Sequence, residues 1–91
     1  MRDLQMRVHE FNKERQWLRY HEPGSLALVM SEELGEIARL VAWGQEPDAE
    51  ELGLELADLI IYALSLANRV GIDAEAMVIR KLAINASRFP A

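Results

Sequence analysis

Residues 26–41 read LALVMSEELGEIARLV, and this stretch decides the fold class. Its apolar side chains recur every three or four residues, which is the spacing of one face of an α-helix. Pro23 suits the first turn of this helix, and Gly44 suits its end. Glycine and proline separate it from three other segments of helical length, and no alternating pattern typical of paired strands occurs. The sequence therefore predicts an all-α protein.

The three other helices have their own start and stop signals. The first is expected to be capped by Asp3 and to end near Tyr20. Another is expected to be capped by Asp48 and closed by Gly71, and the last to be capped by Asp73. Connections of a few residues favour antiparallel neighbours. We therefore predict one domain, residues 1–91, folded as an antiparallel four-helix bundle.

Composition restricts the partners and the compartment of the chain. Its 91 residues are 51% hydrophobic and 27% charged, and none is cysteine. A chain of this size hides only about two-thirds of its surface on folding, so helix packing or oligomerisation must supply stability. A net charge of −5 without a basic run argues against duplex nucleic acid as a partner. The sequence shows neither a membrane span nor a signal segment, which predicts a cytoplasmic protein.

Acidic residues inside the two most hydrophobic helices indicate a metal site. Glu33 and Glu36 are three residues apart on one helix face, and Glu55 and Asp58 repeat this spacing on the next helix. If the helices are antiparallel, the two pairs face each other. Four crowded carboxylates repel one another and lose hydration, and a bound divalent cation relieves that cost. Oxygen ligands select hard ions, here Mg²⁺ or Mn²⁺.

The ordinary explanation of a single Glu-x-x-Glu pair is solvated surface. Two such pairs with apolar neighbours favour the metal site, whereas Glu32 points about 100° away from Glu33 and is expected at the surface. The sequence contains no phosphate-binding loop, nucleophile elbow or zinc-protease motif. It also lacks the Glu-x-x-His pairs of di-iron bundles, so oxygen chemistry is disfavoured.

Two aromatic residues fall in register with the acids. Trp43 lies seven residues after Glu36, and Tyr62 lies seven after Glu55, so each shares a helix face with a predicted ligand. They could stack on a nucleotide base beside the metal. Aromatic residues of a helical bundle more often belong to its core, so this alternative stays open.

Polar residues in two other segments of the chain can also be interpreted in two ways. Lys81, Asn85 and Arg88 share one face of the last helix and could bind phosphates or a base. A solvated basic face near a helix C-terminus is the ordinary explanation. His21, in the turn before Pro23, is more often a cap or a surface residue than a ligand.

Together these residues resemble the all-α nucleoside triphosphate pyrophosphohydrolases related to MazG. The resemblance rests on Glu32-Glu33-Leu34-Gly35-Glu36 and, after eighteen residues, Glu55-Leu56-Ala57-Asp58, which match the family pattern E-E-x-x-E and E-x-x-D. The chain is most similar to the dCTP pyrophosphatase branch. That similarity extends to four more segments: Phe11 to Trp17, Tyr20-His21-Glu22-Pro23, the run from Glu33 to Trp43, and Lys81 to Pro90.

The resemblance implies hydrolysis of a nucleoside triphosphate between its α- and β-phosphates, with dCTP or a modified pyrimidine deoxynucleotide as substrate. It implies that Glu33, Glu36, Glu55 and Asp58 bind Mg²⁺ and are the catalytic residues. The substrate-binding positions that it implies are Trp17, His21, Trp43, Tyr62, Lys81, Asn85 and Arg88. Members of this branch are dimers or dimers of dimers, so a homodimer or homotetramer is expected. The implied role is sanitation or control of the nucleotide pool.

Two other functions remain open at this point. Another nucleotide-like pyrophosphate, such as phosphoribosyl-ATP, could be cleaved with the same carboxylates, although Trp17, His21 and Trp43 favour the first substrate class. The alternative from a different class is a catalytically silent helical dimer that senses a nucleotide or binds a partner. The intact acidic pairs argue against it, because an unused carboxylate cluster is an electrostatic liability.

Overall fold

A computed structural model describes residues 1–44 and 46–91 of the chain. The elements in order are α1 (Arg2–Glu14), the 3₁₀ turn η1 (Leu18–Tyr20), α2 (Pro23–Val41), the 3₁₀ turn η2 (Ala42–Gly44), α3 (Ala49–Val70) and α4 (Ala74–Arg88). All regular structure in these residues is helical, which confirms the predicted all-α class.

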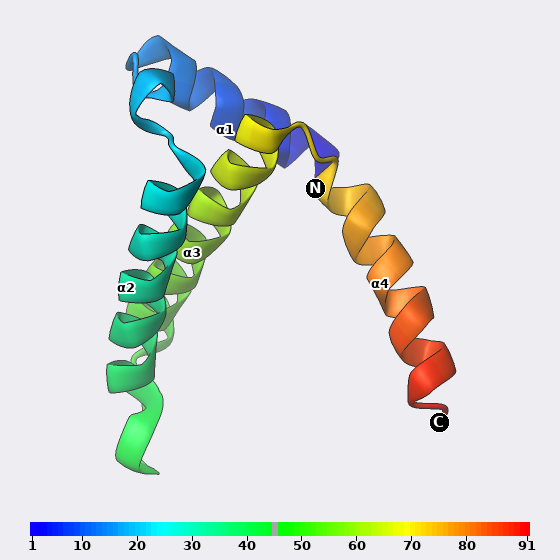
Figure 1. The fold of residues 1–91 in the computed structure, drawn as a ribbon. Helices are drawn as coiled ribbons and strands as arrows, with labels where there is room; N and C mark the ends of the chain where they lie inside the picture. The colour runs from blue at the N-terminus through cyan, green and yellow to red at the C-terminus, as the bar shows by residue number, and fades with distance from the viewer. Residues whose placement is uncertain (45) are drawn as a thin grey trace.

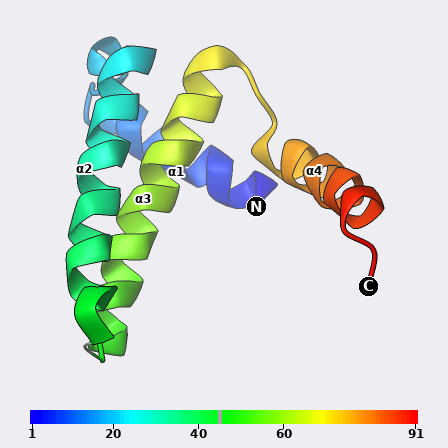
Figure 2. The same ribbon diagram turned by 60° about the horizontal axis from the view of Figure 1, so that its bottom comes forward.

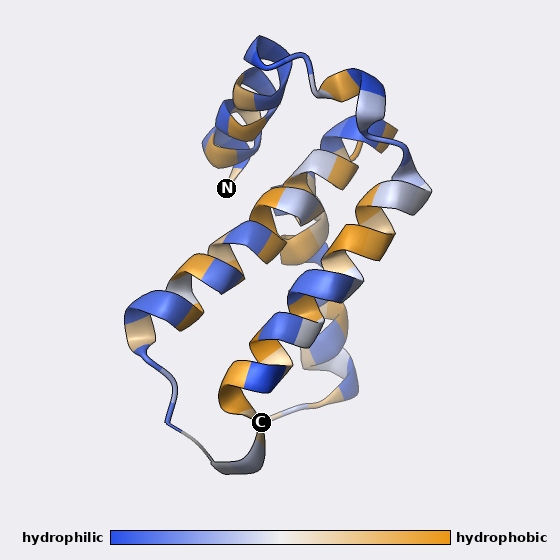
Figure 3. Ribbon diagram, turned by 90° about the vertical axis from the view of Figure 1, so that its left-hand side faces the viewer, coloured by the Kyte–Doolittle hydropathy of each residue, from blue (hydrophilic) through white to orange (hydrophobic). Residues whose placement is uncertain are grey.

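Helices α2 and α3 form an antiparallel pair, and α1 packs across the C-terminal half of α3 (Figure 1). The buried apolar side chains come from these three helices and are Val8, Leu26, Ile37, Leu64 and Ala67. In Figure 3, apolar and polar segments alternate along the helices, as expected of helices with one buried face. No helix in the described part of the chain combines the length and apolar character that crossing a bilayer requires.

The predicted boundaries of α3 and α4 are confirmed. The Asp48 and Asp73 side chains each accept a hydrogen bond from the backbone N–H three residues later, at 3.0 and 3.1 Å. Gly71 ends α3 with a left-handed φ of 75°, a conformation that costs glycine little. The expected cap of α1 is wrong, because Asp3 lies inside its first turn and Met1 occupies the capping position.

The prediction that the first helix continues to near Tyr20 is also wrong, because α1 ends at Glu14. Gln16 adopts a left-handed φ of 59°, and its N–H bonds to the carbonyl of Lys13 at 3.0 Å. The Trp17 N–H bonds to the carbonyl of Asn12, also at 3.0 Å. This pair of bonds is the Schellman ending of a helix, made here without the usual glycine.

The position of helix α4 shows that the predicted antiparallel four-helix bundle is wrong for the last helix. Figures 1 and 2 both show it projecting away from the α2–α3 pair, and its main contacts are with α1. None of its residues is buried. Its exposed apolar side chains are Met77, Val78, Ile79, Leu82 and Ile84. One chain therefore supplies three packed helices and a fourth whose apolar surface is uncovered.

Candidate metal centre

The antiparallel pairing of α2 and α3 brings acidic side chains from the two helices together. One carboxylate oxygen from each of Glu33, Glu55 and Asp58 lies within 4.8 Å of the others. Glu33 comes from the middle of α2, and the other two are one helical turn apart on α3. The structure thus brings together three of the four predicted ligands.

The fourth predicted ligand, Glu36, is exposed and lies outside this three-residue group. Its carboxyl is nevertheless a neighbour of Glu55. The nearby carboxyl of Glu36, burial, and the nearby carboxyl of Glu33 together raise the pKa of Glu55 from 4.5 to about 7. With this pKa, the metal-free Glu55 carboxyl is partly protonated near neutral pH.

Burial makes this cluster costly without a cation. Glu33 Oε2 and Glu55 Oε2 are both buried, and neither has a hydrogen-bond donor. A buried carboxylate oxygen without a donor or a counter-charge is strongly disfavoured. A hard divalent cation among Glu33, Glu55 and Asp58 would satisfy both oxygens and displace the proton from Glu55. The donor set and the two orphaned oxygens therefore fit the predicted metal.

Tyr62 lies beside the cluster, as its position on α3 predicts. Burial and the negative charges of Glu33 and Asp58 raise the pKa of its phenol. The same charges come from two different helices, so the ring is at the junction of α2 and α3 and only partly accessible. The ring therefore lies close enough to these acids for their charges to act on its phenol.

The two tryptophans lie in different surroundings. Trp43 is 96% exposed and has a left-handed φ of 65°, an uncommon conformation for a large side chain. Trp17 is 45% exposed and meets Phe11 edge to face, with ring centroids 5.6 Å apart. Neither ring is buried in the core of this chain.

His21 lies in a small cavity between α1, η1 and α3. His9, Asn12, Ser65 and Arg69 line the same cavity. Partial burial lowers the pKa of His21, so its imidazole is neutral at neutral pH. No sequence pattern described above contains the other four residues. A signal existed for Ser65, which lies seven residues after Asp58 and so shares its face of α3.

The remaining predicted substrate-binding residues, Lys81, Asn85 and Arg88, lie on α4. In this chain α4 points away from the α2–α3 pair that carries the acids (Figures 1 and 2). Arg88 instead lies over the ring of the neighbouring Phe89, 5.2 Å from its centroid. The structure does not bring these three side chains to the carboxylates of the same chain.

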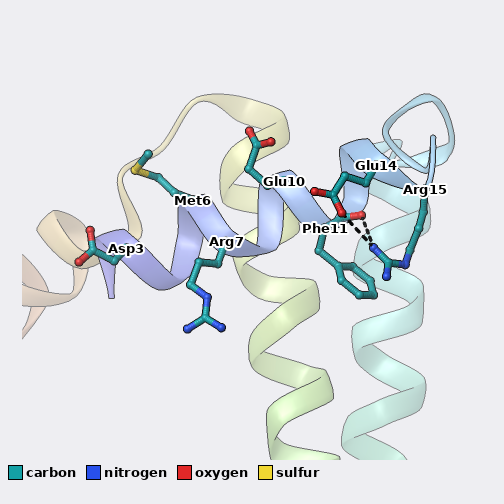
Figure 4. Close-up of a pocket in the computed structure, with 7 residues that line it drawn as sticks. All are labelled: Asp3, Met6, Arg7, Glu10, Phe11, Glu14 and Arg15. Carbon is teal, nitrogen blue, oxygen red and sulfur yellow. Dashed lines mark hydrogen bonds and ion pairs between the residues drawn. The ribbon is translucent and has the colours of Figure 1, made fainter.

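A larger hollow on the surface belongs to α1 and its C-terminal end, and Figure 4 shows its lining. Its charged lining consists of three acidic side chains, Asp3, Glu10 and Glu14, and two basic ones, Arg7 and Arg15. The Arg15 guanidinium lies 3.7 Å from the Glu14 carboxylate and donates to the carbonyl of Phe11 (Figure 4). Among the residues that the structure describes, these three acids do not come within reach of one common ion, so the hollow does not offer a second metal centre.

Known proteins resemble this chain along most of its length. It is 38% identical to human (Homo sapiens) dCTP pyrophosphatase 1 over 96 residues, which covers 93% of the chain and 56% of the relative. It is 36% identical to the dATP/dGTP diphosphohydrolase of cyanophage S-2L over 81 residues, which covers 89% of the chain and 65% of that relative. The chain thus spans only about half the length of the human relative.

The fold has a close counterpart among solved structures. A pyrophosphatase from Archaeoglobus fulgidus DSM 4304 superimposes with a TM-score of 0.81 and 32% identity, over 98% of this chain and 91% of the other. The family resemblance predicted from the acidic pairs is confirmed by a match of the MazG-like family to residues 27–91. The chain belongs to the MazG-like family.

Proposed function

We propose that the chain is a nucleoside triphosphate pyrophosphohydrolase that depends on Mg²⁺ and releases a nucleoside monophosphate and pyrophosphate. The observation that carries the proposal is the group of Glu33, Glu55 and Asp58, with two buried carboxylate oxygens that lack a donor. Hydrolysis of a phosphoanhydride needs charge neutralisation at several phosphate oxygens, which is the chemistry that such a group supports.

Glu33, Glu55 and Asp58 would hold the cation, and Glu36 would join them from the exposed side. When bound, the cation supplies neutralisation of the phosphate charges and acidification of the attacking water. Glu36 is exposed beside Glu55, which supports a role for its carboxylate in orienting water at the open side of the cluster. The packed apolar residues between α2 and α3 hold these acids in place, so little reorganisation accompanies the reaction.

The nucleoside would bind next to the acids. Tyr62 borders the cluster, and the exposed Trp43 offers a face on which a base can stack. Trp17 and His21 flank η1, at the other end of α2 from Trp43, and we propose that they contact the substrate from that end. We propose dCTP or another pyrimidine deoxynucleotide, including modified ones, because the mammalian relatives are named dCTP pyrophosphatase 1. The phage relative is named for dATP and dGTP, so base preference varies among the relatives.

A second copy of the chain would complete the site. Lys81, Asn85 and Arg88 do not approach the carboxylates of their own chain, and α4 exposes large apolar side chains that a partner can cover. We therefore propose a homodimer, or a pair of dimers, in which α4 packs against another subunit. In that arrangement the basic side chains would reach the phosphates of a nucleotide held by the partner's acids.

The test is pyrophosphate release from a panel of canonical and modified nucleoside triphosphates, each assayed with Mg²⁺ and with EDTA. Chromatography identifies the nucleoside product. We expect metal-dependent formation of the monophosphate, with a pyrimidine deoxynucleotide preferred. Formation of a diphosphate would contradict the cleavage site. No turnover on any substrate, together with Mg²⁺ binding, would favour the catalytically silent module over the enzyme.

A further inference from the structure

Helix α4 is attached to the rest of the chain through its first turn. Three contacts with the start of α1 hold that turn. The Met1 amino group lies 3.2 Å from the Glu75 carboxylate, and the Arg2 guanidinium lies 3.0 Å from Asp73. The backbone N–H of Ala74, the first residue of α4, donates to the Gln5 side-chain oxygen at 3.0 Å.

The third of these contacts is the least exposed, because it is partly buried. The side chains of Arg2 and Asp73 are 65% and 41% exposed, and exposed ion pairs contribute little to a fixed geometry. Gln5 is 8% exposed, although it is polar and belongs to an otherwise exposed first turn. Its amide nitrogen donates to the carbonyl of Ile72 at 2.7 Å and to the side-chain oxygen of Asn68 at 3.0 Å.

The Gln5 side chain therefore bridges the end of α3, the α3–α4 connection and the start of α4. Asn68 on α3 reinforces this bridge, because its amide donates to the backbone carbonyl of Gln5 at 3.1 Å. Both ends of the Gln5 amide are used, one as donor and one as acceptor. A side chain with all its groups satisfied in a buried site has one orientation, and it imposes that orientation on the segments it bridges.

We propose that Gln5 is a positioning residue that sets the direction of α4 and, through it, the positions of Lys81 and Asn85. The expected effect of Gln5 on substrate binding rests on the proposed function, in which the side chains of Lys81 and Asn85 reach the nucleotide. Asn85 lies eleven residues after Ala74, about 16 Å along the helix, so a rotation of about 10° at Gln5 displaces Asn85 by about 3 Å. Displacements of this size disrupt productive binding.

The experiment compares Gln5→Met with Asn12→Ala. Methionine fills the same space without hydrogen bonds to Ile72 or Ala74. Asn12 is a matched control, because it is 3% exposed and donates to Ser65 at 2.9 Å, yet it does not touch the α3–α4 connection. The chain has no cysteine, so Arg39→Cys on α2 and Arg80→Cys on α4 provide two unique sites for spin labels.

Distances between the two labels are measured by pulsed electron resonance, with labelled chains diluted in unlabelled protein. We expect one narrow distribution for the parent and for Asn12→Ala, and a distribution about twice as broad for Gln5→Met, because the hydrogen bonds that fix α4 are lost. Equal widths in the parent and in Gln5→Met would overturn the proposal. If Gln5→Met does not fold, Gln5→Asn replaces it, because an amide one methylene shorter cannot reach both Ile72 and Ala74.

Kinetics with the preferred triphosphate provide the second measurement. In Gln5→Met we expect KM to rise about tenfold with a smaller change in kcat, because only a fraction of the molecules has α4 in the binding position. The kinetic control is Asp48→Ala, which removes the hydrogen bond that the Glu51 N–H donates to the Asp48 carboxylate at the other end of α3, and we expect its KM to stay within about twofold of the parent. A broadened distance distribution with an unchanged KM would support the positioning of α4 by Gln5 and would count against the proposed role of α4 in substrate binding.

Discussion

The α2–α3 pair and α4 carry similar apolar side chains but differ in what covers them. Leu26 and Ile37 of α2 and Leu64 of α3 are buried, and the packing of these helices holds the carboxylates in reach of one another. Helix α4 buries none of its residues and exposes Ile79 and Leu82 by more than 60%. The comparison shows that one helix pair gathers the predicted metal ligands within a single chain, whereas this chain leaves the apolar face of α4 uncovered, and we propose that a second chain covers it.

The largest expected effect comes from removing a carboxylate of the pair. In Asp58→Asn or Glu36→Gln we expect turnover to fall about 10³-fold or more, because stabilisation of the phosphate charges is worth several kcal/mol. Helicity measured by circular dichroism should not change. Glu50→Gln, which neutralises an exposed acid in the first turn of α3, is the control and should keep parental activity. Parental turnover in purified Asp58→Asn would falsify the assignment.

Metal binding should stabilise the pair measurably. At 100 times its dissociation constant, Mg²⁺ is expected to add about 2.7 kcal/mol to the free energy of unfolding. Thermal melting with and without Mg²⁺ checks this, with EDTA as the reference. Glu33→Gln should abolish the increase, since it removes one of the two buried oxygens without a donor. If Mg²⁺ stabilises Glu33→Gln as much as the parent, the cation binds at another site.

The dependence of α4 on a partner can be tested through assembly. Ile79→Glu introduces a charge into the exposed apolar face of α4, so we expect the dissociation constant of the oligomer to rise about tenfold or more, since burying a large aliphatic side chain is worth about 1.5–3 kcal/mol. Sedimentation velocity over a range of concentrations measures it. Arg80→Gln, also on α4, is the control. If Ile79→Glu assembles like the parent, the contact between the chains is made by a surface other than this face of α4.

The pH dependence of the protein's stability should arise from Glu55, in the acidic cluster between α2 and α3. The pKa of Glu55 is raised from 4.5 to about 7, so between these values the native metal-free protein keeps a proton that the unfolded chain releases. This contribution to stability is fully present below the lower value and is lost as the pH rises through the higher one. We therefore expect the Tm in EDTA to fall from acidic to neutral pH, and Glu55→Gln to flatten that slope. Saturating Mg²⁺ should reverse the trend, because it displaces the proton.

The smallest effects are expected at two glycines of α3. Gly71, at the junction with α4, has a φ of 75°, so Gly71→Ala should destabilise the protein by about 1 kcal/mol. Gly53 lies inside α3, with nothing within 4 Å of an added Cβ. Gly53→Ala should therefore stabilise it by about 0.5–1 kcal/mol. Denaturant unfolding measures both, and opposite signs distinguish a junction from a helix interior.

The successes of the sequence analysis have a common physical cause. Asp48, Asp73 and Gly71 act on residues close to them in sequence, so their effects on helix ends can be inferred without the fold. The three-residue spacing of Glu55 and Asp58 likewise fixes a shared helix face. The proximity of this face to Glu33 required only that two consecutive helices be antiparallel.

The failures concern interactions that local patterns do not contain. The end of α1 depends on Gln16 adopting a conformation that its residue type disfavours, so no glycine marked it. The direction of α4 depends on Gln5 and Asn68, which are 63 residues apart in sequence. Amphipathic periodicity shows that α4 has an apolar face, but it does not show whether the same chain or another one covers it.

Because the connection between α2 and α3 is short, the acidic cluster depends on contacts that are local in sequence. All four acids lie between Glu33 and Asp58, whereas α4 is held by contacts between distant parts of the chain, such as that of Gln5 with Ala74. Consecutive helices joined by a few residues pair early in folding, since closing a short loop takes well under a microsecond. We therefore expect the carboxylates to come together before α4 docks, so that a cation can bind the helix pair before the fold is complete.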